Sequence, residues 1–437
     1  MIIDNTLFYL ILFACTLTII LLYHRKQYQM YRITLSYYLI AILGSIVYYY
    51  MLTFVIQKEH DYRNIELAPL LFLLCNILIL CYPFKILDKK PINKIESRGL
   101  SIIFERTAIF LGVVSIIPFI TDLIQLSSFN ISSFADSYEN TERNKDLIYY
   151  FSQLKYYLYF WQIPLFFYLI STPRRNKLAL IAIIFCIMST ILHSLVGGGR
   201  GTLVNYCNYI VFFYFIYKEH LEVTIKRILN KVILTAGFLL ITSLSIITWS
   251  RYSTFETESS VKDGLVTWVS LYIGEGPLAF SGQMWDSKVR TKGDNSFSLA
   301  KSILGLRTFK SNAERREYWE RLQDIPNTIF YTIIGDIYSD LGKAYTIIFF
   351  IVFTIIVTRF IKKRQKRGWR VQDLVLLQIY YELVTMGIMN FCFKNYDPQF
   401  LICFTIIQVL IVNNIQKKHI KQLHNGNTSI SYRNSSL

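Results

Sequence analysis

The stretch "LAPLLFLLCNILILCYPFKILDKKPINKIESR", Leu67–Arg98, decides the fold class of this chain. Its first part, Leu67–Phe84, carries no charged residue, and the basic segment Lys85–Arg98 follows at once. A helix needs roughly 20 apolar residues to cross the hydrocarbon core of a bilayer. Backbone groups in lipid must bond internally, which a helix achieves within one segment. The stretch therefore predicts a transmembrane helix that ends at a membrane surface.

The same pattern recurs along the whole chain of 437 residues, of which 53% are hydrophobic and 17% charged. It predicts an all-α, polytopic membrane helical bundle with about eleven spans. A transmembrane β-barrel would instead show short alternating segments, and none dominate. The expected spans are Thr6–Tyr23, Ile33–Ile56, Leu67–Phe84, Ile102–Leu126, Tyr156–Ser171, Leu178–Val196, Leu203–Tyr217, Val232–Trp249, Leu341–Phe360, Val371–Phe393 and Phe400–Ile415.

The basic surplus of the chain follows its predicted topology. Alternate connections are rich in Lys and Arg, for example "TPRRNK" and "RFIKKRQKRGWR". Cytoplasmic loops carry such an excess, so the N-terminus is expected outside and the C-terminus inside. The formal charge of +17 is thereby explained without a nucleic-acid partner.

We expect one integral membrane domain over residues 1–437, with one long extracytoplasmic loop over residues 250–340. This loop is longer than ordinary connections between helices, and structured loops of this kind are usually functional. It contains "SNAERREYWERL", Ser311–Leu322, which predicts a soluble helix. A second polar external connection runs from Ser127 to Lys155.

A glycine-rich motif, "GGGRG", lies at the outer end of the sixth expected span and contains Gly198, Gly199 and Arg200. Glycines let backbone amides approach an anion closely, and arginine offers a planar fork to phosphate. The motif therefore predicts a phosphate or pyrophosphate contact. The alternative is a tight turn whose arginine reaches lipid headgroups.

Two further segments of the expected outer face carry candidate groups. Arg251 follows Trp249 in "TWSRYSTFE" and is either a second cation for the same anion or part of an interfacial anchor. In "YIGEGPLAF", Gly274, Gly276 and Pro277 interrupt an apolar segment around Glu275. This interruption indicates a re-entrant or interfacial segment, or else an ordinary loop turn.

The segment "PNTIFYTIIGDIYSDLGKAY" carries Asn327, Tyr331, Asp336 and Asp340. The two aspartates are four residues apart, so a helix would present them on one face. A carboxylate there can act as general base toward a hydroxyl, or it can cap a helix. Glu382, inside the tenth expected span, is expected to face the protein interior.

The sequence contains no recognised motif for binding a metal ion or a nucleotide. There is no CxxC pair among the seven cysteines, so neither a zinc site nor a disulfide framework is indicated. HExxH, Walker A, GxSxG and EF-hand patterns are also absent from the sequence. A hydrolase or an ATP-driven pump therefore lacks support in the sequence.

On these motifs the chain resembles the oligosaccharide repeat-unit polymerases, the O-antigen polymerase or Wzy-type family. "GGGRGTL", "YIGEGPLAF" and "NTIFYTIIGDIYSDLGKAY" occur in this order around one long external loop. The resemblance covers essentially the whole chain. An Arg-x10-Gly pattern of some family members is not found.

The resemblance implies a membrane glycosyltransferase of the C-type superfamily in the bacterial inner membrane. Such an enzyme joins repeat units carried on undecaprenyl pyrophosphate at the outer face, into O-antigen, capsule or exopolysaccharide. The resemblance also implies that it needs no nucleotide sugar, no metal and no cofactor. Arg200 and Arg251, with the glycines beside Arg200, are then expected to bind the pyrophosphate. Asp336, or else Asp340 or Glu275, would be the base.

The remaining expected contacts are with sugars, lipid and other proteins. The long loop would hold the sugars through Asn327, Tyr331, Trp268 and Trp285. The partners expected are the lipid-linked oligosaccharides and the bilayer, with a chain-length regulator and a flippase as candidates. The competing functions are an O-antigen ligase, a lipid-linked oligosaccharide flippase and a non-enzymatic scaffold or transporter. The external loop has no histidine, which favours the polymerase over the ligase.

Overall fold

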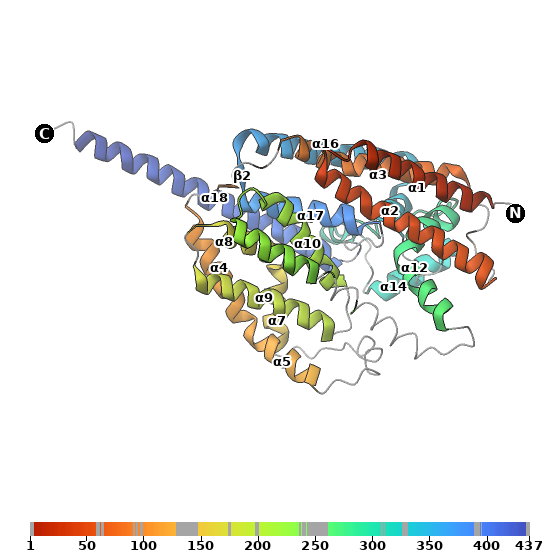
Figure 1. The fold of residues 1–437 in the computed structure, drawn as a ribbon, viewed down its shortest axis with the longest axis horizontal. Coiled ribbons are helices and arrows are strands. Elements are labelled where there is room, and N and C mark those ends of the chain that lie inside the picture. The colour runs from red at the N-terminus through yellow and green to blue at the C-terminus, as the bar shows by residue number, and fades with distance from the viewer. Residues whose placement is uncertain are drawn as a thin grey trace. The chain divides into compact units, whose positions relative to one another are not determined.

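The computed structural model is nearly all helical (Figure 1). It describes residues 4–57, 62, 65–90, 92, 95–96, 99–127, 147–173, 176–196, 201–235, 237, 242, 261–306, 309, 311–325, 331–388, 394 and 396–433. The chain forms two compact units. The first comprises Met1–Pro91, Phe255–Lys366 and Tyr380–Leu401, and the second comprises Ile92–Thr254, Arg367–Ile379 and Ile402–Leu437.

The first unit contains most of the long N-terminal helices and most of the expected external loop. Its helices are α1 (Asn5–Tyr23), α2 (Gln29–Tyr50), α3 (Leu67–Lys89), α12 (Val261–Ala279), α13 (Ser298–Ile303), α14 (Asn312–Gln323), α15 (Ile333–Leu341) and α16 (Lys343–Arg367, whose last residue is assigned to the second unit). Two π-helical turns, η1 (Met51–Val55) and η3 (Phe280–Met284), extend α2 and α12.

The second unit contains the middle helices and a small pair of strands. Its elements are β1 (Ile95–Glu96), α4 (Ser101–Val114), α5 (Ile116–Ser127), α7 (Leu147–Tyr157), α8 (Tyr159–Ser171), α9 (Lys177–Val196), α10 (Gly201–Tyr217) and β2 (Trp369–Arg370). The strands pair in parallel, Ile95 with Trp369 and Glu96 with Arg370. Helices α17 (Val371–Met386) and α18 (Tyr396–Arg433) each contribute residues to both units.

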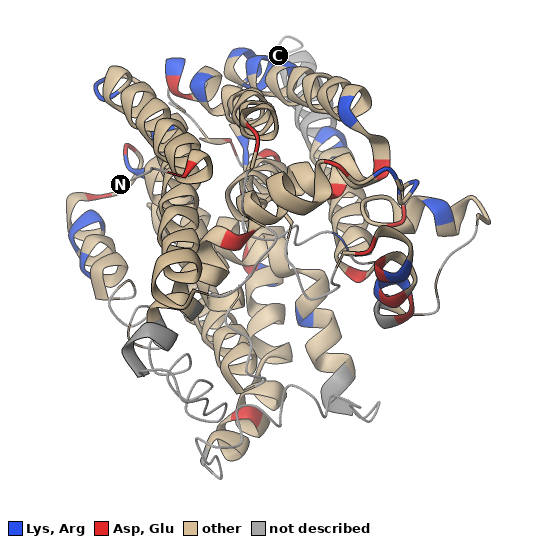
Figure 2. Cartoon of the chain, turned by 90° about the vertical axis from the view of Figure 1, so that its right-hand side faces the viewer, with Lys and Arg blue, Asp and Glu red and all other residues tan. Residues whose placement is uncertain are grey.

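Within the described part of the chain, seven helical segments are long and apolar enough to cross a membrane. These segments are Asn5–Tyr23, Gln29–Val55, Leu67–Lys89, Ser101–Leu126, Lys177–Val196, Lys343–Arg367 and Tyr396–His419. Most of their length carries no charge, and Lys and Arg gather toward helix ends (Figure 2). The helices indicate a membrane protein, as the apolar pattern predicts.

The four remaining expected spans are not established as membrane-crossing. Tyr156–Ser171 corresponds mainly to the shorter apolar helix α8, Leu203–Tyr217 to α10 and Val371–Phe393 to α17. Val232–Trp249 lies largely outside the described residues. The count of eleven and the extracytoplasmic side of the loop therefore stay predictions.

Pro83 removes one backbone hydrogen bond from α3, and a side chain of α16 supplies a replacement donor. Proline has no N–H, so the carbonyl four residues earlier, that of Ile79, loses its helical donor. The Thr354 hydroxyl of α16 donates to the Ile79 oxygen at 3.1 Å. An unpaired carbonyl in an apolar interior is costly, so this bond fixes the register of the two helices. The Gln365 side-chain amide donates to the carbonyls of Ile86 and Leu87, which shows that α3 and α16 run parallel.

Helices α2 and α12 of the first unit cross closely at Gly44 and Gly274. A Cβ on Gly274 would overlap the main chain of Gly44 and Ser45, and one on Gly44 would lie 2.7 Å from Ile273 Cγ2. The Ser45 hydroxyl donates to the Gly274 carbonyl at 2.6 Å. Small residues permit such close backbone contact.

Helix α12 runs without interruption through Gly274, Gly276 and Pro277. The expectation that these residues break the segment is therefore wrong. The glycines serve the packing of α12, and the π-helical turn η3 continues the helix after Ala279. Helix α14 confirms that "SNAERREYWERL" is helical, and the Ser311 hydroxyl caps it by accepting from the Glu314 N–H. Glu382 is 4% exposed, as expected of an interior carboxylate.

The second unit packs α4 against α9 through another small residue, Gly112. A Cβ there would lie 2.6 Å from the Ala182 Cβ. Helices α4 and α5 meet at Ser115, which is the position where the ladder weakens. Pro118 explains the weakening, because its missing N–H leaves the Val114 carbonyl without a helical partner.

The α2–α12 crossing yields a stability prediction. Gly274→Ala adds a methyl group where main-chain atoms lie, so the helices must separate. We expect a loss of about 1–3 kcal/mol in the free energy of unfolding, measured by denaturation in mixed detergent micelles. Gly201→Ala is the control, because no described atom lies within 4 Å of the added Cβ. Equal stability of both variants would contradict the close crossing.

Candidate functional site

Helix α15 is the buried element that carries both predicted aspartates. All residues from Ile333 to Asp340 are buried. The Thr332 hydroxyl caps the helix by accepting from the Gly335 N–H at 3.0 Å. The segment "IIGDIYSD" can be buried because its apolar residues fill the neighbouring space and its polar ones find partners. The prediction that Asp336 and Asp340 share one helix is confirmed.

Asp336, which is buried, forms an ion pair with Lys394. The Lys394 Nζ lies 2.6 Å from the Asp336 Oδ1, and the aspartate side chain is 2% exposed. Burial raises the pKa of Asp336 above its ordinary value, because a low-dielectric surrounding disfavours the charged form. The charge and the hydrogen bond of Lys394 oppose this effect. A desolvated carboxylate beside one cation is suited to accept a proton.

Arg315 from α14 adds a second cation near this carboxylate. Arg315 is 3% exposed. Its Nη1 donates to the carbonyl oxygens of Asp294 at 3.3 Å and Lys394 at 3.0 Å. Burial lowers the pKa of Arg315, while the negative charge of Asp336 raises it. Arg315 thus holds the Lys394 backbone and contributes positive charge to the same site.

Tyr331 and Glu275 complete the cluster. The Lys394 Nζ lies 5.8 Å from the centre of the Tyr331 ring. The Tyr331 hydroxyl is buried and has no hydrogen-bond partner among the described residues. Burial raises the pKa of Tyr331, and the charges of Asp336 and Glu275 raise it further. Glu275 is 8% exposed on α12.

Gly276 allows α12 to approach the start of α15. A Cβ at this position would lie 2.9 Å from the Ile388 carbonyl oxygen and 3.3 Å from the Thr332 Cγ2. The glycine therefore brings the helix of Glu275 against the residue that caps the helix of Asp336. The cluster of Glu275, Tyr331, Asp336, Arg315 and Lys394 comes from segments far apart in the sequence. We call it the Asp336 cluster.

Asp340, one helical turn after Asp336, has a different environment. Its Oδ1 accepts from the Thr291 hydroxyl and from the N–H groups of Gly293 and Asn295, at 2.9 and 3.2 Å. Its Oδ2 accepts from the Ser296 N–H at 2.7 Å. Burial raises the pKa of Asp340, and these hydrogen bonds oppose the rise. Both oxygens hold the loop before α13, which is a structural role.

Trp285 lies in an aromatic group with Phe72, Phe280 and Tyr338. Its ring stacks on Tyr338 with centres 5.6 Å apart, and the Lys343 Nζ lies 3.8 Å from its centre. Only 9% of the residue is exposed. The ring is therefore engaged in packing, and its predicted contact with sugar stays a prediction.

The other predicted site residues cannot be compared with the structure. Arg200, Arg251, Gly198, Gly199 and Asn327 lie outside the described residues, as does the side chain of Trp268. Sequence reasoning also missed two members of the Asp336 cluster. Lys394 could have been found from the sequence, because it is the only cation between the expected spans that end at Phe393 and begin at Phe400. Arg315 lies in a helix with several other charged residues, and nothing in the sequence distinguishes it from them.

A second buried polar group, also missed, lies in the second unit. The His193 Nδ1 lies 3.0 Å from both carboxylate oxygens of Asp122. The Lys155 Nζ donates to the Ser189 hydroxyl at 3.1 Å, and Asp122 and Lys155 interact electrostatically. Ionisable groups among apolar helices are costly and commonly functional. His193 lies four residues before the first glycine of "GGGRG" in the sequence.

The described residues contain no group of three or more His, Cys, Asp or Glu side chains able to hold a metal ion. Comparison with protein-family models, curated proteins and solved structures gives no match to this chain. The fold and the site thus define a helical membrane protein with a buried, charged cluster.

The Asp122–Lys155 interaction is testable by a double-mutant cycle. Asp122→Asn removes the carboxylate that contacts His193 and interacts electrostatically with Lys155, and it should destabilise the protein by roughly 1–3 kcal/mol. Lys155→Met in the same chain should restore part of that loss, giving a coupling energy of roughly 0.5–3 kcal/mol. Denaturation in mixed micelles measures the stability of each variant. Lys231→Met, at an exposed position, is the control and should be additive with Asp122→Asn.

Proposed function

We propose that this chain polymerises oligosaccharide repeat units carried on undecaprenyl pyrophosphate, at the outer face of the bacterial inner membrane. The ion pair between the buried Asp336 carboxylate and Lys394 is the observation that carries the proposal. It supplies a carboxylate with a raised pKa, next to two cations, in a protein whose helices fit a bilayer. The order of the three sequence motifs along the chain supports the same family.

In the proposed reaction, a hydroxyl of one lipid-linked unit attacks the anomeric carbon of the growing chain. A C–O bond forms to the acceptor oxygen, and the bond from the anomeric carbon to the pyrophosphate oxygen breaks. Asp336 accepts the hydroxyl proton, and the electron pair leaves with undecaprenyl pyrophosphate. No nucleotide sugar takes part.

Each residue of the proposed site has a stated task. Lys394 keeps Asp336 ionised until the proton arrives, and Arg315 holds Lys394 in place through its carbonyl. Arg200 and Arg251 would stabilise the charge that develops on the pyrophosphate, and preorganised charge of this kind commonly accounts for much of an enzyme's rate enhancement. Glu275 is the alternative base, since it contributes to the same electrostatic environment at Tyr331.

Complementation of a gene deletion tests the proposal. Without the protein, we expect one repeat unit on the surface anchor instead of a ladder of lengths. Asp336→Asn removes the base and should lower polymerisation by about 100-fold to 10,000-fold, leaving the single unit on a polysaccharide gel. Asp336→Glu, which keeps a carboxylate, should restore part of the ladder.

Asp324→Asn is the matched control, because Asp324 is exposed and its left-handed backbone accommodates asparagine. It should produce a full ladder, and all variants should reach the membrane in equal amount on an immunoblot. Loss of all anchored sugar with lipid-linked polymer accumulating would assign the ligase function instead. A deletion strain that exports no repeat unit would assign the flippase function.

The pH dependence of the purified enzyme gives an independent prediction. Asp336 must be deprotonated to act as base, so the rate should fall as the pH drops through its raised pKa. This acid limb should lie above about 3.9, the ordinary aspartate value. Lys394→Met removes the charge and hydrogen bond that lower the pKa, so the limb should move to higher pH. Lys288→Met is the control, and an unmoved limb in Lys394→Met would contradict the pairing.

A further inference from the structure

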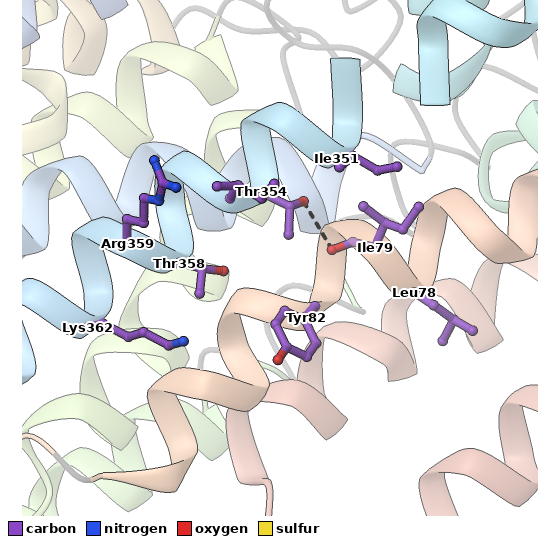
Figure 3. A pocket seen from close by; sticks show the side chains of 9 residues that line it. Leu78, Ile79, Tyr82, Ile351, Thr354, Thr358, Arg359 and Lys362 are labelled. Atoms are coloured by element: carbon purple, nitrogen blue, oxygen red, sulfur yellow. Dashed lines mark hydrogen bonds between the residues drawn. The ribbon is translucent and has the colours of Figure 1, made fainter. Parts of the chain in front are cut away.

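A groove between α3 and α16 lies on the surface of the first unit, apart from the Asp336 cluster (Figure 3). Its volume is about 540 Å³. The lining residues are Leu78, Ile79, Tyr82, Ile351, Thr354, Ile355, Thr358, Arg359 and Lys362. Most of the wall is apolar, and both cations belong to one end of the α16 segment.

The length of the groove matches one leaflet of a bilayer. From Ile351 to Lys362 the helix rises about 16 Å at roughly 1.5 Å per residue. The hydrocarbon core is about 30 Å thick, so this segment spans about half of it. Ile351 and Ile355 are 41% and 44% exposed, as expected of side chains that face acyl chains.

The charged end of the groove fits an anionic headgroup. Arg359 and Lys362 are exposed, and neither forms an ion pair among the described residues. In Figure 3 Lys362 extends toward α3, on the side where the Tyr82 hydroxyl lies. This end of α16 belongs to the segment "RFIKKRQKRGWR", whose charge predicts the cytoplasmic surface. Anionic lipids concentrate there.

A buried hydroxyl independently points to a ligand. Thr354 donates to the Ile79 carbonyl, whereas the Thr358 hydroxyl is buried and has no hydrogen-bond partner in the described part of the chain. Thr358 is 7% exposed and lines the groove between the apolar wall and the cations. Buried polar groups are normally paired, so an ester or phosphate oxygen at this depth would satisfy it.

We infer that the groove between α3 and α16 binds one anionic phospholipid of the cytoplasmic leaflet. One acyl chain lies along Leu78, Ile351 and Ile355, and the phosphate lies at Arg359 and Lys362. The inference requires only that the chain lies in a bilayer with this end of α16 at the cytoplasmic surface, so it stands or falls separately from the polymerase proposal.

Native mass spectrometry of the full chain, with added phosphatidylglycerol or phosphatidylcholine, tests the inference. The anionic lipid should bind more tightly. Arg359→Ala with Lys362→Ala should weaken phosphatidylglycerol binding by about 25-fold, which is about 2 kcal/mol at 1.4 kcal/mol per tenfold. Thr358→Val should weaken it by a smaller factor.

Two matched variants separate this site from general surface attraction. Lys363→Ala with Lys366→Ala removes the same charge from exposed positions of α16 that do not line the groove, and binding should be unchanged. Ile355→Trp fills the groove, keeps both cations, and should abolish tight binding. The inference is overturned by equal loss in the Lys363/Lys366 variant, or by full binding in a folded Ile355→Trp variant. It is also overturned if undecaprenyl pyrophosphate displaces phosphatidylglycerol from the groove, because the site then belongs to the substrate.

Discussion

The close crossing of α2 and α12 is the constraint on which the candidate site of the first unit depends. Gly44 and Gly274 have no side chain, so the two backbones meet and Ser45 donates to the Gly274 carbonyl. The next residue along α12 is Glu275, and Gly276 then contacts Thr332, the cap of α15. A larger residue at either glycine would move Glu275 away from Tyr331 and Asp336. The glycines of "YIGEGPLAF" therefore position charged groups by packing and not by flexibility.

Asp336 and Asp340 show how burial assigns different chemistry to identical side chains. Both lie on α15 and both are nearly inaccessible. Asp340 accepts hydrogen bonds from a hydroxyl and three backbone N–H groups, so its charge is committed to holding a loop. Asp336 instead accepts a hydrogen bond from the side chain of Lys394. This difference in partners makes Asp336 the better candidate for proton transfer.

Much of the fold could be predicted because apolar length and helical geometry are properties of single segments. The spans Thr6–Tyr23, Leu67–Phe84 and Leu178–Val196 correspond to long helices, and Ser311–Leu322 is helical as expected. The prediction of an interruption at Gly274–Pro277 was wrong. Glycine weakens an isolated helix, but packing against a neighbouring helix can hold it in helical conformation. The candidate site was predicted only in part. Asp336, Tyr331 and Glu275 contribute to one cluster, while Arg315 comes from a helix whose charges all look alike in sequence.

The sequence by itself determined that the protein is helical and suited to a bilayer, because the cost of unpaired backbone groups in lipid leaves few alternatives. It also placed two aspartates on one helix, since the helical period is fixed. The tertiary structure decided which aspartate pairs with Lys394 and which anchors a loop. It also decided that Thr354 supplies the hydrogen bond that Pro83 removes from Ile79. These outcomes depend on residues distant in the chain, and local patterns carry no information on how such residues meet.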